Sequence, residues 1–230
     1  MESIEKRLAH IRNEIRMAAK ACGRNPETID LVAVSKRKSS DAVTSAIQAG
    51  VTLLGENYIQ EAMDKIDTIG NTPASWHFIG HLQSNKARFA VQYFDMIHTV
   101  DSLKLAREIN KQAAKINKRQ AILMQVNIAD EASKSGTTAA KALELARAIA
   151  PLDHIHLTGL MGMPPFFDNP EGARPYFKAM ATLFTTIQAE KIPGIDLKHL
   201  SMGMSGDFKV AIEEGSTMVR IGTAIFGSRE

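Results

Sequence analysis

Cysteine is nearly absent from this sequence, since Cys22 is the single example among 230 residues. A lone cysteine excludes an intramolecular disulfide, and with it the disulfide framework that staples many small secreted proteins. Cys22 follows an amphipathic segment. We expect it to lie late in a helix as a buried, inert thiol.

Long apolar stretches are also absent. No window approaches the ~20 apolar residues that a membrane-spanning helix requires. The first 21 residues are charged throughout and lack the apolar core of a secretion signal, while Glu2, Glu5 and Glu14 argue against a mitochondrial transit peptide. We therefore expect a cytoplasmic protein that does not contact membranes.

Neither sign of charge dominates the chain. It has 28 Lys and Arg against 25 Asp and Glu, which gives a formal net charge of +3. A charge this small gives no electrostatic footprint for nucleic acid, and we predict that none is bound. The 15 glycines and 8 prolines are too few for a collagen-like or low-complexity chain. The length fits one barrel-sized domain spanning residues 1–230.

What the sequence does have is a regular alternation of two patterns. Apolar residues at helical spacing predict an amphipathic helix over about 2–22, and the β-branched run 31–35 predicts a buried strand. The cycle then repeats to the end of the chain. We expect further strands at 52–55, 76–80, 96–100, 121–127, 156–161, 198–202 and 218–221, and further helices near 40–50, 57–68, 84–92, 102–117, 138–149, 171–190 and 207–213.

Eight strands that alternate with helices predict a parallel sheet. Eight such strand–helix units within about 230 residues match the size of a single (β/α)8 TIM-type barrel, here with an extra N-terminal helix. A doubly wound open sheet is the alternative, but it calls for a glycine-rich turn after the first strand. The residues at that place are Lys36, Arg37, Lys38 and Ser39, so the barrel is favoured.

In such barrels the chemistry lies at the carboxyl ends of the strands. The residues expected there show no metal-ligand cluster, no Cys/His pair and no G-x-S-x-G nucleophile elbow. They do include two anion-binding patterns, one in 219–224 with Arg220, Gly222 and Thr223, the other in 200–207 with Ser201. Glycines and hydroxyls of this kind can cradle a phosphate, although they are also common in ordinary turns.

Lys36 allows two interpretations. It can be a solvated lysine in a basic run, or an amine at the barrel mouth whose charged form is disfavoured by desolvation and nearby cations. A Schiff base requires such a neutral amine. An aldehyde that carries a phosphate, such as pyridoxal 5′-phosphate (PLP), would use both Lys36 and the anion-binding loops. A Schiff-base aldolase acting on a sugar phosphate would use them too.

Six segments together resemble the pyridoxal phosphate homeostasis protein family, in order and over nearly the whole chain. They are VAVSK at 32–36, GENYIQE at 55–61, WHFIGHLQSNK at 76–86, SKSG at 133–136, LSMGMS at 200–205 and GSTMVRIGTAIFG at 215–227. The resemblance implies a single barrel similar to the N-terminal domain of alanine racemase. It also implies PLP as cofactor and a role in vitamin B6 balance, with PLP-dependent apo-enzymes as potential recipients.

The resemblance also assigns roles to residues. Lys36 is expected to hold PLP as an internal aldimine, and Arg220 to face the pyridine nitrogen. Phosphate contacts are expected from Ser201, Gly222 and Thr223. Asn57 and Met202 are expected to line the pocket, and Lys134 to lie in a loop associated with a secondary cofactor contact.

A permanently charged guanidinium cannot accept the proton that activates the pyridine ring of PLP. The chain also has no room after Thr223 for the second domain of the related racemases. We therefore expect a monomeric cofactor-binding protein without catalytic turnover, with a racemase-like PLP enzyme as the alternative.

Overall fold

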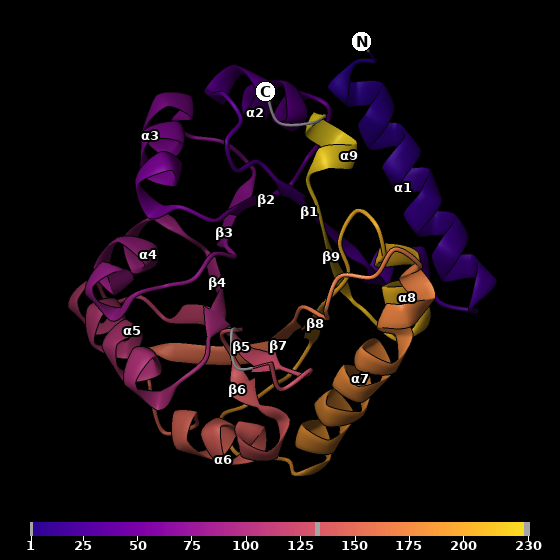
Figure 1. Ribbon diagram of the computed structural model, residues 1–230. Coiled ribbons are helices and arrows are strands. Elements are labelled where there is room, and N and C mark those ends of the chain that lie inside the picture. The colour runs from indigo at the N-terminus through magenta and orange to yellow at the C-terminus, as the bar shows by residue number, and fades with distance from the viewer. Residues whose placement is uncertain (1, 132–133, 228–230) are drawn as a thin grey trace.

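Eight parallel strands follow one another around a closed ring in the computed structural model, which describes residues 2–131 and 134–227 (Figure 1). Each strand pairs with its neighbour in the chain, and the last pairs with the first through Val32 and Arg220. The ring runs β1 (Asp30–Val34), β2 (Leu53–Glu56), β3 (Ser75–Phe78), β4 (Met96–Val100), β5 (Gln120–Asn127), β7 (Ile155–Gly162), β8 (His199–Ser201) and β9 (Met218–Ile221). The predicted (β/α)8 barrel is confirmed. The short β6 (Thr137–Thr138) pairs with the carboxyl end of β5, at Val126 and Asn127.

Helices cover the outside of the ring. They are α1 (Ile4–Ala21), α2 (Ser40–Gln48), α3 (Ile59–Ile69), α4 (Ala87–Tyr93), α5 (Leu103–Lys115), α6 (Ala139–Ile149), α7 (Arg174–Ala189), α8 (Phe208–Glu213) and α9 (Thr223–Phe226), with short 3₁₀ turns at Pro26–Thr28, Ser84–Lys86 and Pro170–Ala173. The helix after the last strand, α9, is only four residues long. The extra N-terminal helix α1 packs against α2, α8 and α9 and so fills the gap that α9 leaves in the helical layer (Figure 1).

Apolar side chains fill two separate volumes. The larger cluster lies between the strands and the helices, where inward-facing residues of each amphipathic helix meet the sheet. The smaller cluster is formed by Val32, Met96, Leu123, Met161 and Met218. These five residues come from five different strands, which places them inside the ring. They close the barrel toward the amino ends of the strands, so any site must lie toward the carboxyl ends.

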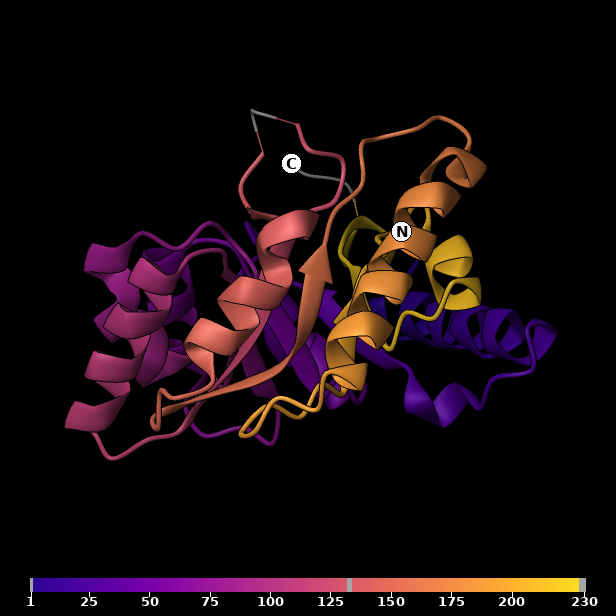
Figure 2. The same ribbon diagram turned by 90° about the horizontal axis from the view of Figure 1, so that it is seen from below.

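The carboxyl ends of the strands form one edge of the molecule (Figure 2). The arrow of β7 points toward this edge, where the long connections after β5 and β7 rise above the barrel. Ser133, part of one segment that carries the family resemblance, lies outside the described residues.

One prediction about local structure is wrong. Cys22 ends α1 as its C-cap and is exposed, not buried. Its thiol donates to the main-chain oxygens of Ala18 and Ala19 at the last turn of the helix. The amphipathic pattern of α1 ends one residue before Cys22, so the chain has already turned away from the core there. Along the described ranges, none of the helices has the length and apolar character to cross a membrane.

Candidate functional site

A buried guanidinium lies inside the barrel, on the carboxyl-end side of the smaller apolar cluster. Arg220 on β9 is 4% exposed, and its Nη1 donates to Oγ of Ser201 at 2.6 Å while Nη2 donates to the carbonyl oxygen of Gly162 at 3.0 Å. Burial lowers the pKa of Arg220 to about 10, so the group remains protonated at neutral pH. In the described ranges no carboxylate forms an ion pair with it. The mouth of the barrel therefore has a fixed positive charge at its base.

Two histidines continue this network across the barrel. Nδ1 of His98 lies 3.2 Å from Oγ of Ser201, and Nε2 of His98 lies 3.0 Å from Nδ1 of His77. Arg220 has donors alone, so the Ser201 hydroxyl accepts from it and is free to donate to His98. That direction makes His98 the Nε2–H tautomer, which then donates to His77.

Both histidines are neutral at pH 7. Burial lowers the pKa of His77 to about 4, and burial, followed by the charges of His77 and Arg220, holds the pKa of His98 well below its usual range. The positive charge of the network therefore resides on Arg220. Sequence patterns alone do not identify these two histidines as members of a site. His77 stands one residue and His98 two residues from the nearest end of its strand, and only the strand register reveals that both face the barrel interior.

Lys36 comes two residues after the last residue of β1, between the ends of β2 and β9. The amide of Ser35 still donates to the carbonyl oxygen of Gly55 on β2 at 3.0 Å. On the β9 side, a Cβ added to Gly222 would lie 3.2 Å from the carbonyl oxygen of Val34. Lys36 lies in the turn that follows β1, the strand whose Val32 faces the barrel interior. Lys36 is half-buried, and no hydrogen bond or ion pair with another described residue occupies its amine.

Asn57, at the end of β2, opens onto a cavity of about 200 Å³ at the mouth. Gln125 from β5 lines the same cavity. The side-chain oxygens Oδ1 of Asn57 and Oε1 of Gln125 are buried and have no hydrogen-bond partner among the described residues. The other polar residues of its lining are His81, Thr99, Asn127, Lys134 and Ser135. Buried acceptors without partners are costly unless a ligand or water satisfies them, so this cavity is suited to a polar ligand.

Two hydroxyls mark the opposite side of the mouth. Oγ1 of Thr223 donates to Oγ of Ser205 at 3.4 Å, which brings the loops after β8 and β9 together. Gly222 precedes Thr223 and allows the chain to pass close to β1. Ser205 was part of the glycine- and serine-rich loop seen in the sequence, but it was not singled out. Two hydroxyls on neighbouring loops are well placed to donate hydrogen bonds to an anion.

Two residues expected at the site have other contacts. Ser201 is expected at the phosphate together with Gly222 and Thr223, but its hydroxyl bonds to Arg220 and His98, whereas Thr223 bonds to Ser205. Met202, the residue that follows β8, points the other way. Its side chain is completely buried in the cluster between sheet and helices, so it packs behind the site instead of lining it.

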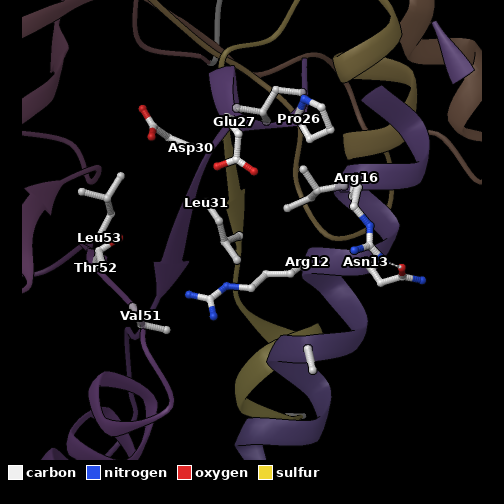
Figure 3. A pocket seen from close by; sticks show the side chains of 13 residues that line it. Arg12, Asn13, Arg16, Pro26, Glu27, Asp30, Leu31, Val51, Thr52 and Leu53 are labelled. Atoms are coloured by element: carbon white, nitrogen blue, oxygen red, sulfur yellow. Dashed lines mark hydrogen bonds between the residues drawn. The ribbon is translucent and has the colours of Figure 1, made fainter. Parts of the chain in front are cut away.

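A separate hollow of about 480 Å³ lies at the amino end of the barrel, between α1 and the starts of β1 and β2 (Figure 3). Arg12, Asn13 and Arg16 of α1 face Asp30 and neighbouring strand residues there. Arg12 already donates to the carbonyl oxygen of Gly50, and Arg16 to Oδ1 of Asn13. Because its cations are engaged and it lies at the end opposite Lys36, this hollow is not part of the candidate site. Across the described ranges, no group of His, Cys, Asp and Glu could hold a metal ion.

Comparison with known proteins agrees with this architecture. The sequence model of the family described as "Alanine racemase, N-terminal domain" matches residues 7–230. The "Pyridoxal phosphate homeostasis protein" of Vibrio alginolyticus is 46% identical over 234 residues, covering 100% of this chain and 99% of that protein. The protein of the same name from Aquifex aeolicus is 38% identical and covers 98% of each chain.

Solved structures give the same result. PipY of Synechococcus elongatus, solved with PLP bound, is 32% identical with a TM-score of 0.86, over 98% of this chain and 100% of that one. An alanine racemase of Clostridium difficile has a TM-score of 0.72 at 16% identity, over 97% of this chain but 56% of the racemase. The racemase likeness shows the fold alone. With full-length relatives at 38–46% identity, the chain belongs to the pyridoxal phosphate homeostasis protein family.

Proposed function

We propose that this protein binds PLP at the carboxyl end of the barrel and serves PLP homeostasis, with Lys36 as the residue that bonds the aldehyde. The observation that carries the proposal is the position of Lys36, half-buried between the ends of β2 and β9, in the same barrel mouth as the buried Arg220. The amine at the side of the mouth suits the aldehyde of PLP, and the guanidinium at its base suits the pyridine nitrogen.

The residues present fit the cofactor. The Thr223 and Ser205 hydroxyls, with the backbone of Gly222, would hold the phosphate. Ser205 would then make the phosphate contact that is expected of Ser201 from the sequence, because Ser201 is bonded to Arg220. Arg220 would face the pyridine nitrogen, since its bonds to Ser201 and Gly162 use two of its five N–H groups. The unpartnered oxygen of Asn57 supplies a buried acceptor beside the ring. Met202 supports this arrangement from behind.

We further propose that the protein holds PLP without turning over substrate. PLP supplies an electrophilic aldehyde and an electron-accepting ring, and the ring accepts electrons best when its nitrogen is protonated. Arg220 has a pKa of about 10 and donates protons in hydrogen bonds, so it favours the unprotonated nitrogen. The neutral histidines behind it supply no proton at pH 7. A protein that stores PLP in this way would deliver it to PLP-dependent apo-enzymes. It would thereby contribute to vitamin B6 balance.

The test is the absorption spectrum of the purified protein with added PLP, before and after borohydride. We expect a visible band that borohydride removes, with the reduced adduct mapped to Lys36 by peptide mass spectrometry. Lys36→Ala should form no adduct at this position. The matched control is Lys104→Ala on the surface of α5, which should label as the wild type does. A colourless protein that ignores PLP would overturn the proposal.

The same preparation addresses turnover. A panel of D- and L-amino acids that includes alanine should show no sustained racemisation above the Lys36→Ala background. Sustained turnover would favour the racemase-like alternative. The monomeric state, the cytoplasmic location and the single cofactor-binding domain over residues 1–230 stay predictions, which size-exclusion chromatography with light scattering, cell fractionation and limited proteolysis would test.

A further inference from the structure

A buried ionic cluster lies on the outer side of the barrel, behind Lys36. Lys65 on α3 is 5% exposed, and its Nζ lies 2.8 Å from Oε1 of Glu56 and 2.6 Å from Oε1 of Glu61. Glu56, at the end of β2, is completely buried, and Glu61 lies in the first turn of α3. One ammonium thus joins two carboxylates from two elements, under the carboxyl end of β1.

The same three side chains bind the peptide on both sides of Lys36. Before it, Nζ of Lys65 donates to the carbonyl oxygen of Ser35 at 2.7 Å, and Oγ of Ser35 donates to Oε1 of Glu56 at 2.6 Å. After it, the amide of Arg37 donates to Oε1 of Glu61. The residues on either side of Lys36 are therefore tied to one cluster, while the Lys36 amine makes no hydrogen bond or ion pair with another described residue.

The backbone at this place needs such support. Arg37 has φ of +59°, a left-handed conformation that is unfavourable for a residue with a side chain. A strained residue persists where its surroundings over-determine it, and such residues cluster at functional sites. Two hydrogen bonds hold this turn: the amide of Arg37 donates to Oε1 of Glu61, and the amide of Lys38 donates to the carbonyl oxygen of Ser35 at 3.1 Å.

Stability alone is a weak reason for such a cluster. Taking ions out of water costs several kcal/mol each, and a buried ion pair is often no more stable than apolar side chains of the same volume. Here Oε2 of Glu56 is buried without a hydrogen-bond partner among the described residues, and burial raises the pKa of Glu56. The cluster therefore leaves one buried carboxylate oxygen without a hydrogen bond, yet each of its three side chains bonds to the Ser35–Arg37 segment.

We propose that Lys65, with Glu56 and Glu61, is a positioning residue that fixes the Ser35–Lys36–Arg37 peptide so that the Lys36 amine is presented to the aldehyde of PLP. The inference rests on the proposed function of Lys36 and deepens it. Lys65 does not touch the cofactor. It acts through the backbone on either side of the reacting amine.

The experiment compares Lys65→Met with a matched control, Lys118→Met. Lys118 is also a partly buried lysine whose Nζ donates to two backbone carbonyls, those of Val91 and Phe94, at 2.7 Å each. Val91 lies in the last turn of α4 and Phe94 is the C-cap of that helix, so both carbonyls lie at the amino end of the barrel. Both variants should lose thermal stability. The rate of PLP capture by Lys36, followed by the visible absorption band, should fall about tenfold to a hundredfold in Lys65→Met and stay within twofold of wild type in Lys118→Met.

Hydrogen exchange in the PLP-free protein gives a readout that does not depend on the cofactor. The Arg37 amide should exchange faster in Lys65→Met, and also in Glu61→Gln, than in wild type or Lys118→Met. Glu61→Gln changes a partly exposed carboxylate and carries the test if Lys65→Met does not fold. If wild type fails to capture PLP at all, the proposed function fails, and the exchange data alone then decide whether the cluster holds this peptide.

Two outcomes would overturn the positioning role. In the first, the variants that fold capture PLP at the wild-type rate with an unchanged Arg37 amide. In the second, Lys118→Met slows capture as much as Lys65→Met, which would reduce the effect to general destabilisation.

Discussion

Nδ1 of His98 on β4 lies 3.2 Å from Oγ of Ser201 on β8, inside the barrel. Ser201 receives a hydrogen bond from Arg220, so a neutral histidine orients the hydroxyl that orients the guanidinium. A protonated His98 has no acceptor for the Ser201 proton and would add a second positive charge beside Arg220. The low pKa values of His98 and His77 therefore keep the base of the site in one state.

Stability should depend on pH through this histidine pair. The pKa of His77 is about 4 in the folded protein and near 6.5 when unfolded, so between these values the unfolded chain binds more protons. The stability that the neutral His77 supports is fully present above pH 6.5 and is lost as the pH falls toward 4. This loss lowers the free energy of unfolding by on the order of 3 kcal/mol. Urea titrations from pH 4.5 to 7.5 should show a shallower pH dependence in His77→Gln than in wild type. The control His10→Gln, on the exposed face of α1, should follow the wild-type curve, and an unchanged slope in His77→Gln would refute the assignment.

The alternation of the sequence was sufficient to predict the barrel. Short β-branched runs and amphipathic segments differ in period, and the predicted bounds of β4 and β9, 96–100 and 218–221, agree with the structure. The two-residue β6 and the four-residue α9 were missed, because elements this short have no measurable periodicity. Cys22 was misassigned since a helix boundary decides its exposure.

The site was predictable only where a strand end could be located. Lys36, Asn57 and Arg220 follow from that rule. The parity of Ser201 and Met202 could not be fixed, because a shift of one residue exchanges the two faces of a strand. Contacts between distant strands, such as His77 with His98, depend on register and barrel closure, about which a single sequence carries no information.

Arg220→Lys should weaken PLP binding. Lysine keeps the charge but replaces the planar fork, so it cannot serve Ser201, the Gly162 carbonyl and a ligand together. Loss of one charge-assisted hydrogen bond predicts an increase in Kd of about tenfold to a hundredfold, measured by absorbance titration. Arg12→Lys, whose guanidinium binds the Gly50 carbonyl at the amino end, is the matched control and should bind PLP normally. Equal affinities for both variants would remove Arg220 from the site.

The phosphate side can be tested with two ligands. Thr223→Val removes the hydroxyl at constant volume and should raise the Kd for PLP about fivefold to a hundredfold, because a hydrogen bond to a charged group is lost. The affinity for pyridoxal, which has no phosphate, should not change. Ser205→Ala should act in the same way. Thr185→Val, which removes a hydroxyl bonded to the Ala181 carbonyl on α7, is the control. A parallel loss for pyridoxal would show that Thr223 acts on the fold and not on the phosphate.

Gly80 connects the fold to the site. A Cβ at this position would lie 2.0 Å from the carbonyl oxygen of Asn57, a separation that only a backbone shift can relieve. Gly80→Ala should therefore displace Asn57 and the end of β2, with a loss of about 3 kcal/mol of stability in urea unfolding. PLP affinity should fall in the same variant, since the Asn57 oxygen lines the mouth cavity.

The matched control for this substitution is Gly206→Ala, where an added Cβ meets nothing within 4 Å. Its stability should stay within about 0.5 kcal/mol of wild type. If Gly80→Ala were equally mild, the β2 end would be free to move away from Gly80 without loss. Asn57 would then not be held in place by this contact, and its role at the mouth would have to rest on the cavity alone.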